Sequence, residues 1–129
     1  MIVVDSSVIV AALIHTGPDA DWAESTLLSD ATCAPSLMHY EAANVIRRSV
    51  ARGEIDASVG AAAFADLRAL PLVTVPFDLT AERSWELRDT ITMYDGAYVA
   101  AAEILNAPLY TLDRRLANAP GPRCPILTP

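Results

Sequence analysis

No lysine occurs anywhere in this chain, and all nine of its basic side chains are arginines. This absence excludes nucleotide-binding loops of the P-loop type, Schiff-base chemistry and any phosphate site built on an ammonium group. The chain is also acidic, with a formal net charge of −7 at pH 7. Because phosphate contacts dominate affinity for nucleic acids, such a chain can bind RNA or DNA only through metal ions or a local cluster of arginines.

Long apolar runs and a cysteine framework are missing as well. No apolar stretch reaches the roughly 20 residues that span a membrane, and no signal sequence opens the chain. We therefore expect a cytoplasmic protein without membrane attachment. The two cysteines, Cys33 and Cys124, have neither metal-ligand spacing nor the density of a disulfide scaffold, so free thiols are predicted. The length predicts one domain that spans residues 1–129.

Short apolar runs alternate with helical segments along the whole chain. Strands are predicted at residues 2–4, 32–35, 72–75 and 109–112, with a short edge strand at 126–127; helices are predicted at 8–14, 20–28, 37–52, 57–70, 78–88 and 95–105, with a helical turn at 114–118. This alternation is typical of α/β proteins with helices on both faces of a sheet. The predicted fold class is a three-layer α/β/α arrangement with a mostly parallel sheet of four to five strands.

Two of the predicted strands end in an aspartate. Asp5 follows the apolar run of residues 2–4, and Asp113 follows the run of residues 109–112. If both strands are parallel, both carboxylates emerge at the carboxyl edge of the sheet, where open α/β sheets bind ligands. Taken alone, Asp5 could instead cap the next helix, and the two serines that follow it are further candidates for that cap.

Two further acids fall on predicted helices. Glu41 borders the apolar stripe of the helix at residues 37–52, and acids rarely do so unless they are paired or bind a metal. Asp95 opens the helix at residues 95–105, which is so small and apolar that it must pack tightly into the core. The alternatives are an arginine partner for Glu41 and a helix-capping role for Asp95.

Four carboxylates that meet at one edge of a sheet repel one another, so their pKa values rise unless a cation balances them. Oxygen ligands without histidine or cysteine suit Mg²⁺ or Mn²⁺. A common task of these ions is to polarise a phosphate and to generate the hydroxide that attacks it. The spacing of the acids therefore indicates metal-dependent chemistry on phosphodiesters, provided that the predicted sheet forms.

Four segments that contain these acids resemble the PIN-domain family, and more narrowly the VapC toxins of bacterial toxin–antitoxin pairs. They are Val3–Ser7, His39–Val45, Tyr94–Glu103 and Leu109–Leu116, in the usual order and at the usual spacing, and the resemblance covers the whole chain. One departure is mild, since Gly96 stands where many relatives carry a bulkier residue. Each motif is weak alone, but four in register are specific.

The resemblance implies a metal-dependent endoribonuclease with a Rossmann-like strand order. By motif match, Asp5, Glu41, Asp95 and Asp113 would hold Mg²⁺ or Mn²⁺ as catalytic residues, with Ser6 and Thr111 as supporting polar residues. The partners that it implies are an RNA substrate, a second copy of the chain in a homodimer, and a VapB-type antitoxin whose tail fills the active-site groove.

Four arginines are candidates for contacts to RNA phosphates, because guanidinium groups suit phosphate oxygens. With 3.6 residues per helical turn, Arg48 and Arg52 lie on the same side of the predicted helix as Glu41. Arg114 and Arg115 follow Asp113 directly. The alternative for each is an ordinary solvated arginine.

Other protein families in which a strand ends in an aspartate match this sequence less well. A haloacid dehalogenase phosphatase requires a second acid two residues on, where this chain has Ser7, and also a lysine. A two-component receiver domain requires a lysine and an acid pair. The remaining alternative is a PIN-fold module that binds RNA or an antitoxin without cutting.

Overall fold

Strand β1 (Ile2–Val4) lies at the centre of the sheet in the computed structural model, which describes residues 1–129. The other strands are β2 (Thr32–Pro35), β3 (Leu72–Val75), β4 (Leu109–Tyr110) and β5 (Ile126–Leu127), in the order β3-β2-β1-β4-β5. All four pairings are parallel. The predicted five strands are confirmed, although β4 ends two residues earlier than expected.

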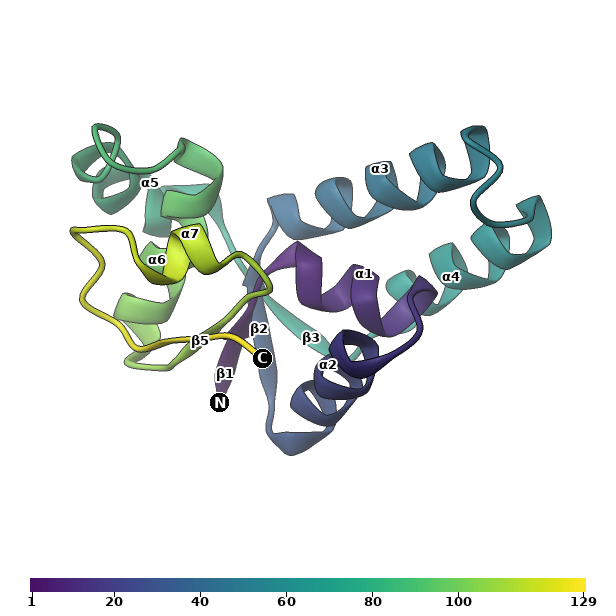
Figure 1. The fold of residues 1–129 in the computed structure, drawn as a ribbon. Coiled ribbons are helices and arrows are strands. Elements are labelled where there is room, and N and C mark those ends of the chain that lie inside the picture. The colour runs from purple at the N-terminus through teal and green to yellow at the C-terminus, as the bar shows by residue number, and fades with distance from the viewer.

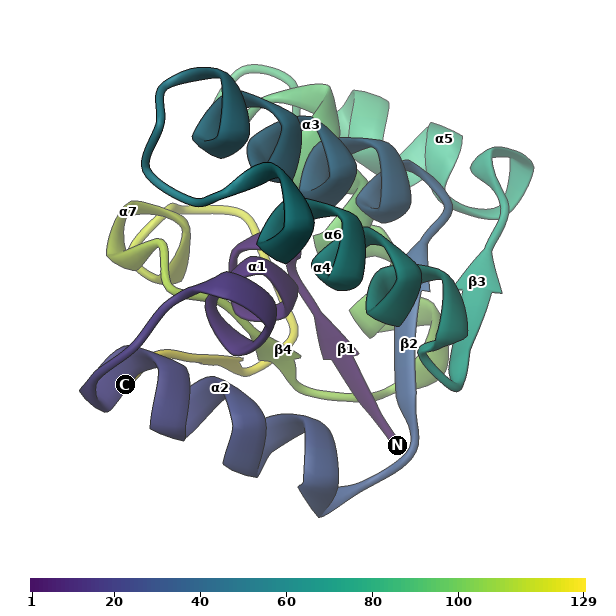
Figure 2. The ribbon, with the colours of Figure 1, turned by 90° about the vertical axis from the view of Figure 1, so that its right-hand side faces the viewer.

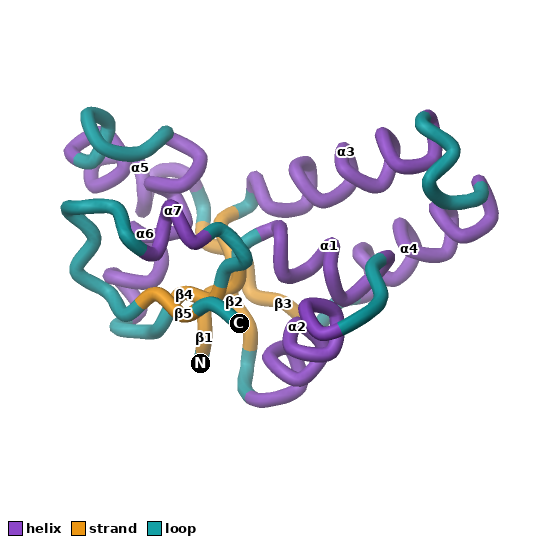
Figure 3. The backbone as a smooth tube through the Cα atoms, in the orientation of Figure 1, coloured by secondary structure: helices purple, strands orange, loops and turns teal.

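Seven helices cover the two faces of this sheet (Figure 1). On one face lie α1 (Ser6–Ile14), α2 (Pro18–Ser29), α3 (Leu37–Ala51) and α4 (Ala57–Ala69); on the other lie α5 (Phe77–Glu86), α6 (Met93–Leu105) and α7 (Arg114–Ala117). Figure 2 views the molecule from the side of α1 to α4, with these helices in front of the strands. The strands form the middle layer in Figure 3, which confirms the predicted three-layer class.

The two helical layers explain why β1 is wholly apolar. Ile2, Val3 and Val4 are at most 4% exposed, because helices cover both faces of a central parallel strand. Helix α6 is buried from Gly96 to Ala102. A Cβ atom at Gly96 would lie 3.1 Å from the Cα of Ser84, so this glycine permits the close approach of α5 and α6. The departure from the family pattern thus has a packing reason.

The helix starts near the acids differ from the predicted ones. Helix α6 begins at Met93, and its N-cap is Thr92, whose hydroxyl accepts a hydrogen bond of 3.1 Å from the backbone N–H of Asp95. The capping role proposed for Asp95 is therefore wrong, and its carboxylate lies in the first turn of the helix. Asp5 occupies the N-cap position of α1 without a side-chain capping bond, and the serines after it lie inside the helix.

Both cysteines are free, with Cys33 buried in β2 and Cys124 half-buried near the C-terminus. None of the seven helices combines the length and the apolarity that crossing a lipid bilayer requires.

The core makes a direct prediction for stability. Leu109 in β4 is fully buried, whereas Leu28 in α2 is 88% exposed. We expect Leu109→Ala to lower the free energy of unfolding by about 2–5 kcal/mol, because it leaves a cavity beside the central strand. Leu28→Ala is the matched control and should change stability by less than about 0.5 kcal/mol. Urea unfolding monitored by circular dichroism measures both, and equal losses would contradict the assigned core.

Candidate active site

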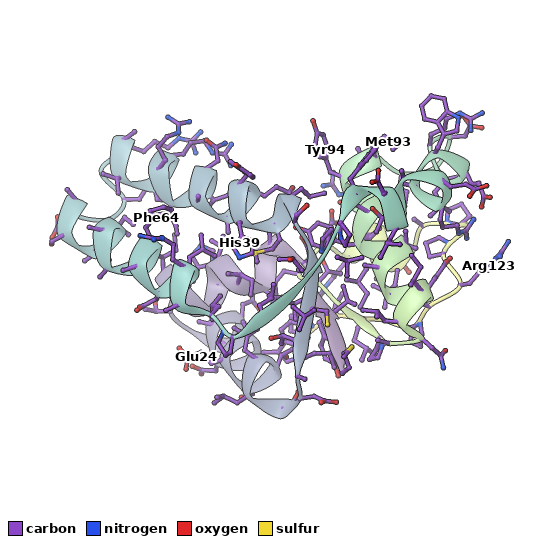
Figure 4. The ribbon with its side chains drawn as sticks, turned by 180° about the vertical axis from the view of Figure 1, so that it is seen from behind. Glu24, His39, Phe64, Met93, Tyr94 and Arg123 are labelled. Carbon is purple, nitrogen blue, oxygen red and sulfur yellow. The ribbon has the colours of Figure 1, made fainter.

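The carboxyl edge of the sheet gathers the predicted acids. Val4 pairs with Tyr110 in the β1–β4 ladder, so Asp5 and the segment that leads to Asp113 leave the sheet side by side. Helix α3 starts directly after β2 and carries Glu41, while the first turn of α6 carries Asp95. Figure 4 shows the first two residues of α6, Met93 and Tyr94, at the same end of the sheet from which α3 starts.

Asp5 is held by hydroxyl groups from the first turn of α1 and from the segment that follows β4. It is 8% exposed, and its Oδ2 accepts hydrogen bonds from Thr111 at 2.6 Å and from Ser7 at 2.9 Å. Its Oδ1 accepts a longer bond of 3.2 Å from Ser6. Since Thr111 is fully buried, its hydroxyl fixes the carboxylate in one orientation. Both supporting residues predicted from the sequence therefore contact Asp5.

Ser7 is a site residue that the sequence reasoning missed. Its hydroxyl donates to Asp5 and accepts a hydrogen bond of 3.1 Å from the backbone N–H of Leu112. The Thr111 hydroxyl makes a similar link, since it accepts from the N–H of Asp113 at 3.0 Å. These bonds connect the end of β1 to the segment after β4. The spacing of Ser7, two residues after a strand-end aspartate, was the available signal.

Glu41 is half-buried and has one neutral partner. The hydroxyl of Tyr98 donates a 2.6 Å hydrogen bond to Glu41 Oε1. Burial raises the pKa of Glu41, the Tyr98 hydrogen bond opposes this, and the negative charges of Asp5 and Asp95 raise it further. Tyr98 itself is fully buried, and burial together with Glu41 raises its pKa, so the phenol stays protonated and donates. The alternative that an arginine pairs with Glu41 is wrong.

Asp95 is under the same electrostatic influence. Burial raises its pKa, and the charges of Asp5 and Asp113 add to the rise, while the Thr92 hydrogen bond and Arg115 oppose it. Asp113 differs, because Arg115 donates to it through its guanidinium and its backbone N–H and holds the pKa of that carboxyl below its usual range. The four acids therefore form one coupled cluster in which Asp113 alone has a cationic partner.

The predicted arginines divide into two groups. Arg115 belongs to the site, with its guanidinium 3.3 Å from Asp113. Arg114 bonds weakly to the backbone oxygen of Pro129 at 3.4 Å, and Arg52 lies 3.9 Å from Glu54 at the distal end of α3. Arg48 is exposed farther along the same helix. The structure brings only Arg115 into contact with an acid of the cluster, and RNA contacts by all four arginines stay predictions.

The donor set fits a hydrated divalent cation. The cluster offers carboxylate and hydroxyl oxygens without a thiolate or an imidazole, which suits Mg²⁺ or Mn²⁺. No group of three or more acids, histidines or cysteines converges tightly enough to enclose an ion by itself. Mg²⁺ usually keeps several water ligands and takes only one or two carboxylates directly, so a loose cluster is compatible with it. Burial raises the pKa values of Glu41 and Asp95, neighbouring carboxylates raise them further, and a bound cation would favour the charged form of both groups.

An open pocket of about 460 Å³ adjoins two of the acids. Asp95 and Asp113 form part of its wall, and the segment that joins α5 to α6 forms much of the remainder. The pocket is accessible and carries both acidic and basic groups.

Comparison with known proteins assigns the family. A sequence profile of the PIN domain matches residues 2–122, which include all four acids. The chain belongs to the PIN-domain family. Among its VapC relatives is ribonuclease VapC9 of Mycobacterium tuberculosis, 36% identical over 126 residues, an alignment that covers 98% of this chain and 96% of VapC9. The resemblance to PIN domains of the VapC type is thereby confirmed.

Solved structures agree with the PIN fold. Mycobacterium tuberculosis VapC20, described as a toxin that cleaves the sarcin-ricin loop, superposes with a TM-score of 0.70 at 16% identity, covering 92% of this chain and 94% of VapC20. VapBC2 from Rickettsia felis, solved with a DNA fragment from their promoter, gives a TM-score of 0.67 at 17% identity, with coverage of 99% and 98%. At these identities the likeness establishes the fold alone.

Burial and the neighbouring carboxylates raise the pKa of Glu41, so its charge is expected to destabilise the folded protein at neutral pH. The pKa of Glu41 is higher in the folded protein than in the unfolded chain, so folding favours the protonated form. The stability that this form contributes is fully present below the ordinary glutamate pKa of about 4.3 and is lost as the pH rises through the pKa of the folded state. Glu41→Gln should therefore raise the free energy of unfolding at neutral pH in chelator-containing buffer. The gain should shrink below the ordinary pKa.

The matched control is Glu24→Gln on the exposed face of α2 (Figure 4), which should change stability little at either pH. Urea unfolding at both pH values measures the difference. Destabilisation by Glu41→Gln at neutral pH would contradict the prediction, because it would show that the glutamate charge does not destabilise the folded protein.

Proposed function

We propose that this PIN domain is a metal-dependent endoribonuclease that acts as the toxin of a VapBC-type pair. It hydrolyses RNA phosphodiester bonds with Asp5, Glu41, Asp95 and Asp113 as the catalytic and metal-binding residues. The observation that carries the proposal is the convergence of these four carboxylates at one edge of the sheet, where burial raises the pKa values of Glu41 and Asp95 and neighbouring carboxylates raise them further. The 36% identity to a VapC ribonuclease supports it.

Each acid has a distinct place in the proposed site. Asp5 and Asp95 are the principal ligands of Mg²⁺ or Mn²⁺, and Glu41 and Asp113 complete the site directly or through water. When bound, such an ion lowers the pKa of a coordinated water molecule and stabilises the charge that develops on the phosphate.

The surrounding side chains orient these acids. Thr111, Ser7 and Ser6 fix the carboxylate of Asp5 by three hydrogen bonds. Tyr98 occupies one oxygen of Glu41 and leaves the other available. Such partners of metal ligands commonly change activity or metal affinity by 10- to 100-fold, at the order-of-magnitude level, when they are removed.

The proposed partners follow from the same assignment. RNA is the substrate, a VapB-type antitoxin is the inhibitor, and two copies of the chain form a homodimer that assembles with the antitoxin. The 36% identity to ribonuclease VapC9 over nearly the whole chain supports this arrangement. Because the RNA targets of such a toxin are inside the cell, we place the protein in the cytoplasm.

A PIN-fold module that binds RNA or an antitoxin without cutting is the second candidate. Four acids are present at the positions that the family motifs occupy, and Asp5 is oriented by three hydroxyl groups. A binding module has no need for such a concentration of negative charge, so the nuclease is favoured.

The nuclease is tested by cleavage of cellular RNA with Mg²⁺ or Mn²⁺ added to the purified protein. Asp5→Asn should lower the cleavage rate by at least about 100-fold, because it removes a principal metal ligand. Asp66→Asn, on the exposed surface of α4, is the matched control and should cut at the wild-type rate. Chelation by EDTA should abolish cleavage, and either metal should restore it. Equal cleavage by wild type and Asp5→Asn would identify a contaminating nuclease and overturn the assignment.

A further inference from the structure

The pocket beside the acids has basic and hydroxyl groups to which the proposed reaction assigns no role. Its lining includes Arg88, Thr90 and Thr92 from the segment that joins α5 to α6, together with Arg115 and the two acids Asp95 and Asp113. The volume of about 460 Å³ falls within the roughly 300–1,000 Å³ of typical small-ligand sites. The threonines and arginines are exposed, so a bound molecule could reach their side chains.

Arg88 is the free cation of this pocket. Its guanidinium lies 4.6 Å from the centre of the Trp85 ring, and its Nη1 donates a 2.8 Å hydrogen bond to the backbone oxygen of Trp85. The arginine salt bridges of the structure involve Arg52, Arg83 and Arg115, so Arg88 has no carboxylate partner. Stacking on an aromatic ring limits the rotamers of an arginine, so less entropy is lost when it binds a phosphate.

The charge of the pocket depends on the acids. Its lining contains three carboxylates (Asp89, Asp95 and Asp113) against two guanidinium groups (Arg88 and Arg115), which leaves one net negative charge. A divalent cation at the acids reverses the sign of this balance. Since Arg115 is already paired with Asp113, Arg88 is the group best able to attract a phosphate into the pocket.

We propose that this pocket binds a nucleotide that flanks the scissile phosphate of single-stranded RNA, with Arg88 as the contact to its phosphate and Trp85 as the residue that positions Arg88. The hydroxyls of Thr90 and Thr92 line the same pocket and are available to the phosphate or the ribose. The inference rests on the proposed function, because it extends the RNA-binding surface from the four acids to the α5–α6 segment. It adds a binding residue that the motif positions do not include.

Arg88→Gln tests the contact, with Arg68→Gln on the distant helix α4 as the control of equal charge change. The substrate is a short single-stranded RNA that spans a site cut by the wild-type protein. Arg88→Gln should raise the KM by about 10-fold and leave kcat within about two-fold, and it should reduce the slope of log KM against log salt by about 1. Arg68→Gln should match wild type in all three quantities.

A second readout does not depend on cleavage. Fluorescence anisotropy with the same labelled RNA, in Ca²⁺ as an oxygen-binding ion in place of Mg²⁺, should show a similar loss of affinity for Arg88→Gln. Trp85→Ala should weaken binding in the same direction, and Trp85→Phe, which keeps an aromatic ring under Arg88, should restore most of it. Arg88→Lys should fall between wild type and Arg88→Gln, because it keeps the charge without the planar fork.

The outcomes separate this inference from the proposed function. Wild-type protein that cuts no RNA would overturn both. Wild-type cleavage with unchanged KM, salt slope and RNA affinity in Arg88→Gln would overturn the pocket alone. A change of molar mass in solution on Trp85→Ala or Arg88→Gln would assign this face to contact between subunits and would likewise overturn it.

Discussion

The gathering of four carboxylates at one partly buried edge of the sheet is the constraint on which the rest of this structure depends. Burial and neighbouring acids raise the pKa values of Glu41 and Asp95, and only Asp113 has a cationic partner within reach. A cluster of this kind is unfavourable for folding in the absence of a cation. The fold must therefore hold the acids in place with interactions that do not neutralise them.

The holding interactions come from neutral donors and from the core. Hydroxyl groups of Ser7 and Thr111 tie Asp5 to the segment after β4, and the buried phenol of Tyr98 ties Glu41 to α6. Helix α6 can carry Tyr98 and Asp95 because it is buried from Gly96 to Ala102 against the sheet and α5. The charged site thus depends on the close packing of α6, in which small residues, including Gly96 at the contact with α5, allow the neighbouring elements to approach.

The sequence was sufficient for the architecture and, through the family motifs, for the gathering of the four acids at one edge of the sheet. Apolar runs that end in Asp5 and Asp113 predict parallel strands and a shared edge, and α3 and α6 were found by their periodicity. Contacts between distant parts of the chain could not be predicted from the sequence. The hydrogen bond from Tyr98 to Glu41 joins residues 57 positions apart. In the sequence, a tyrosine in an apolar helix is interpreted as a core residue, so nothing there indicates this bond. The N-cap of α6 was misplaced because Asp95 and Thr92 are both good caps, and only the backbone geometry distinguishes them.

Direct measurement of a divalent cation at the acids tests the central claim most simply. Titration of the metal-free protein with Mn²⁺, followed by electron paramagnetic resonance, reports binding without any RNA. We expect saturable binding that Asp5→Asn and Asp95→Asn each weaken by at least about 10-fold, while Asp66→Asn leaves it unchanged. Mn²⁺ binding of equal strength in wild type and in both site variants would contradict the claim that these carboxylates form one metal site.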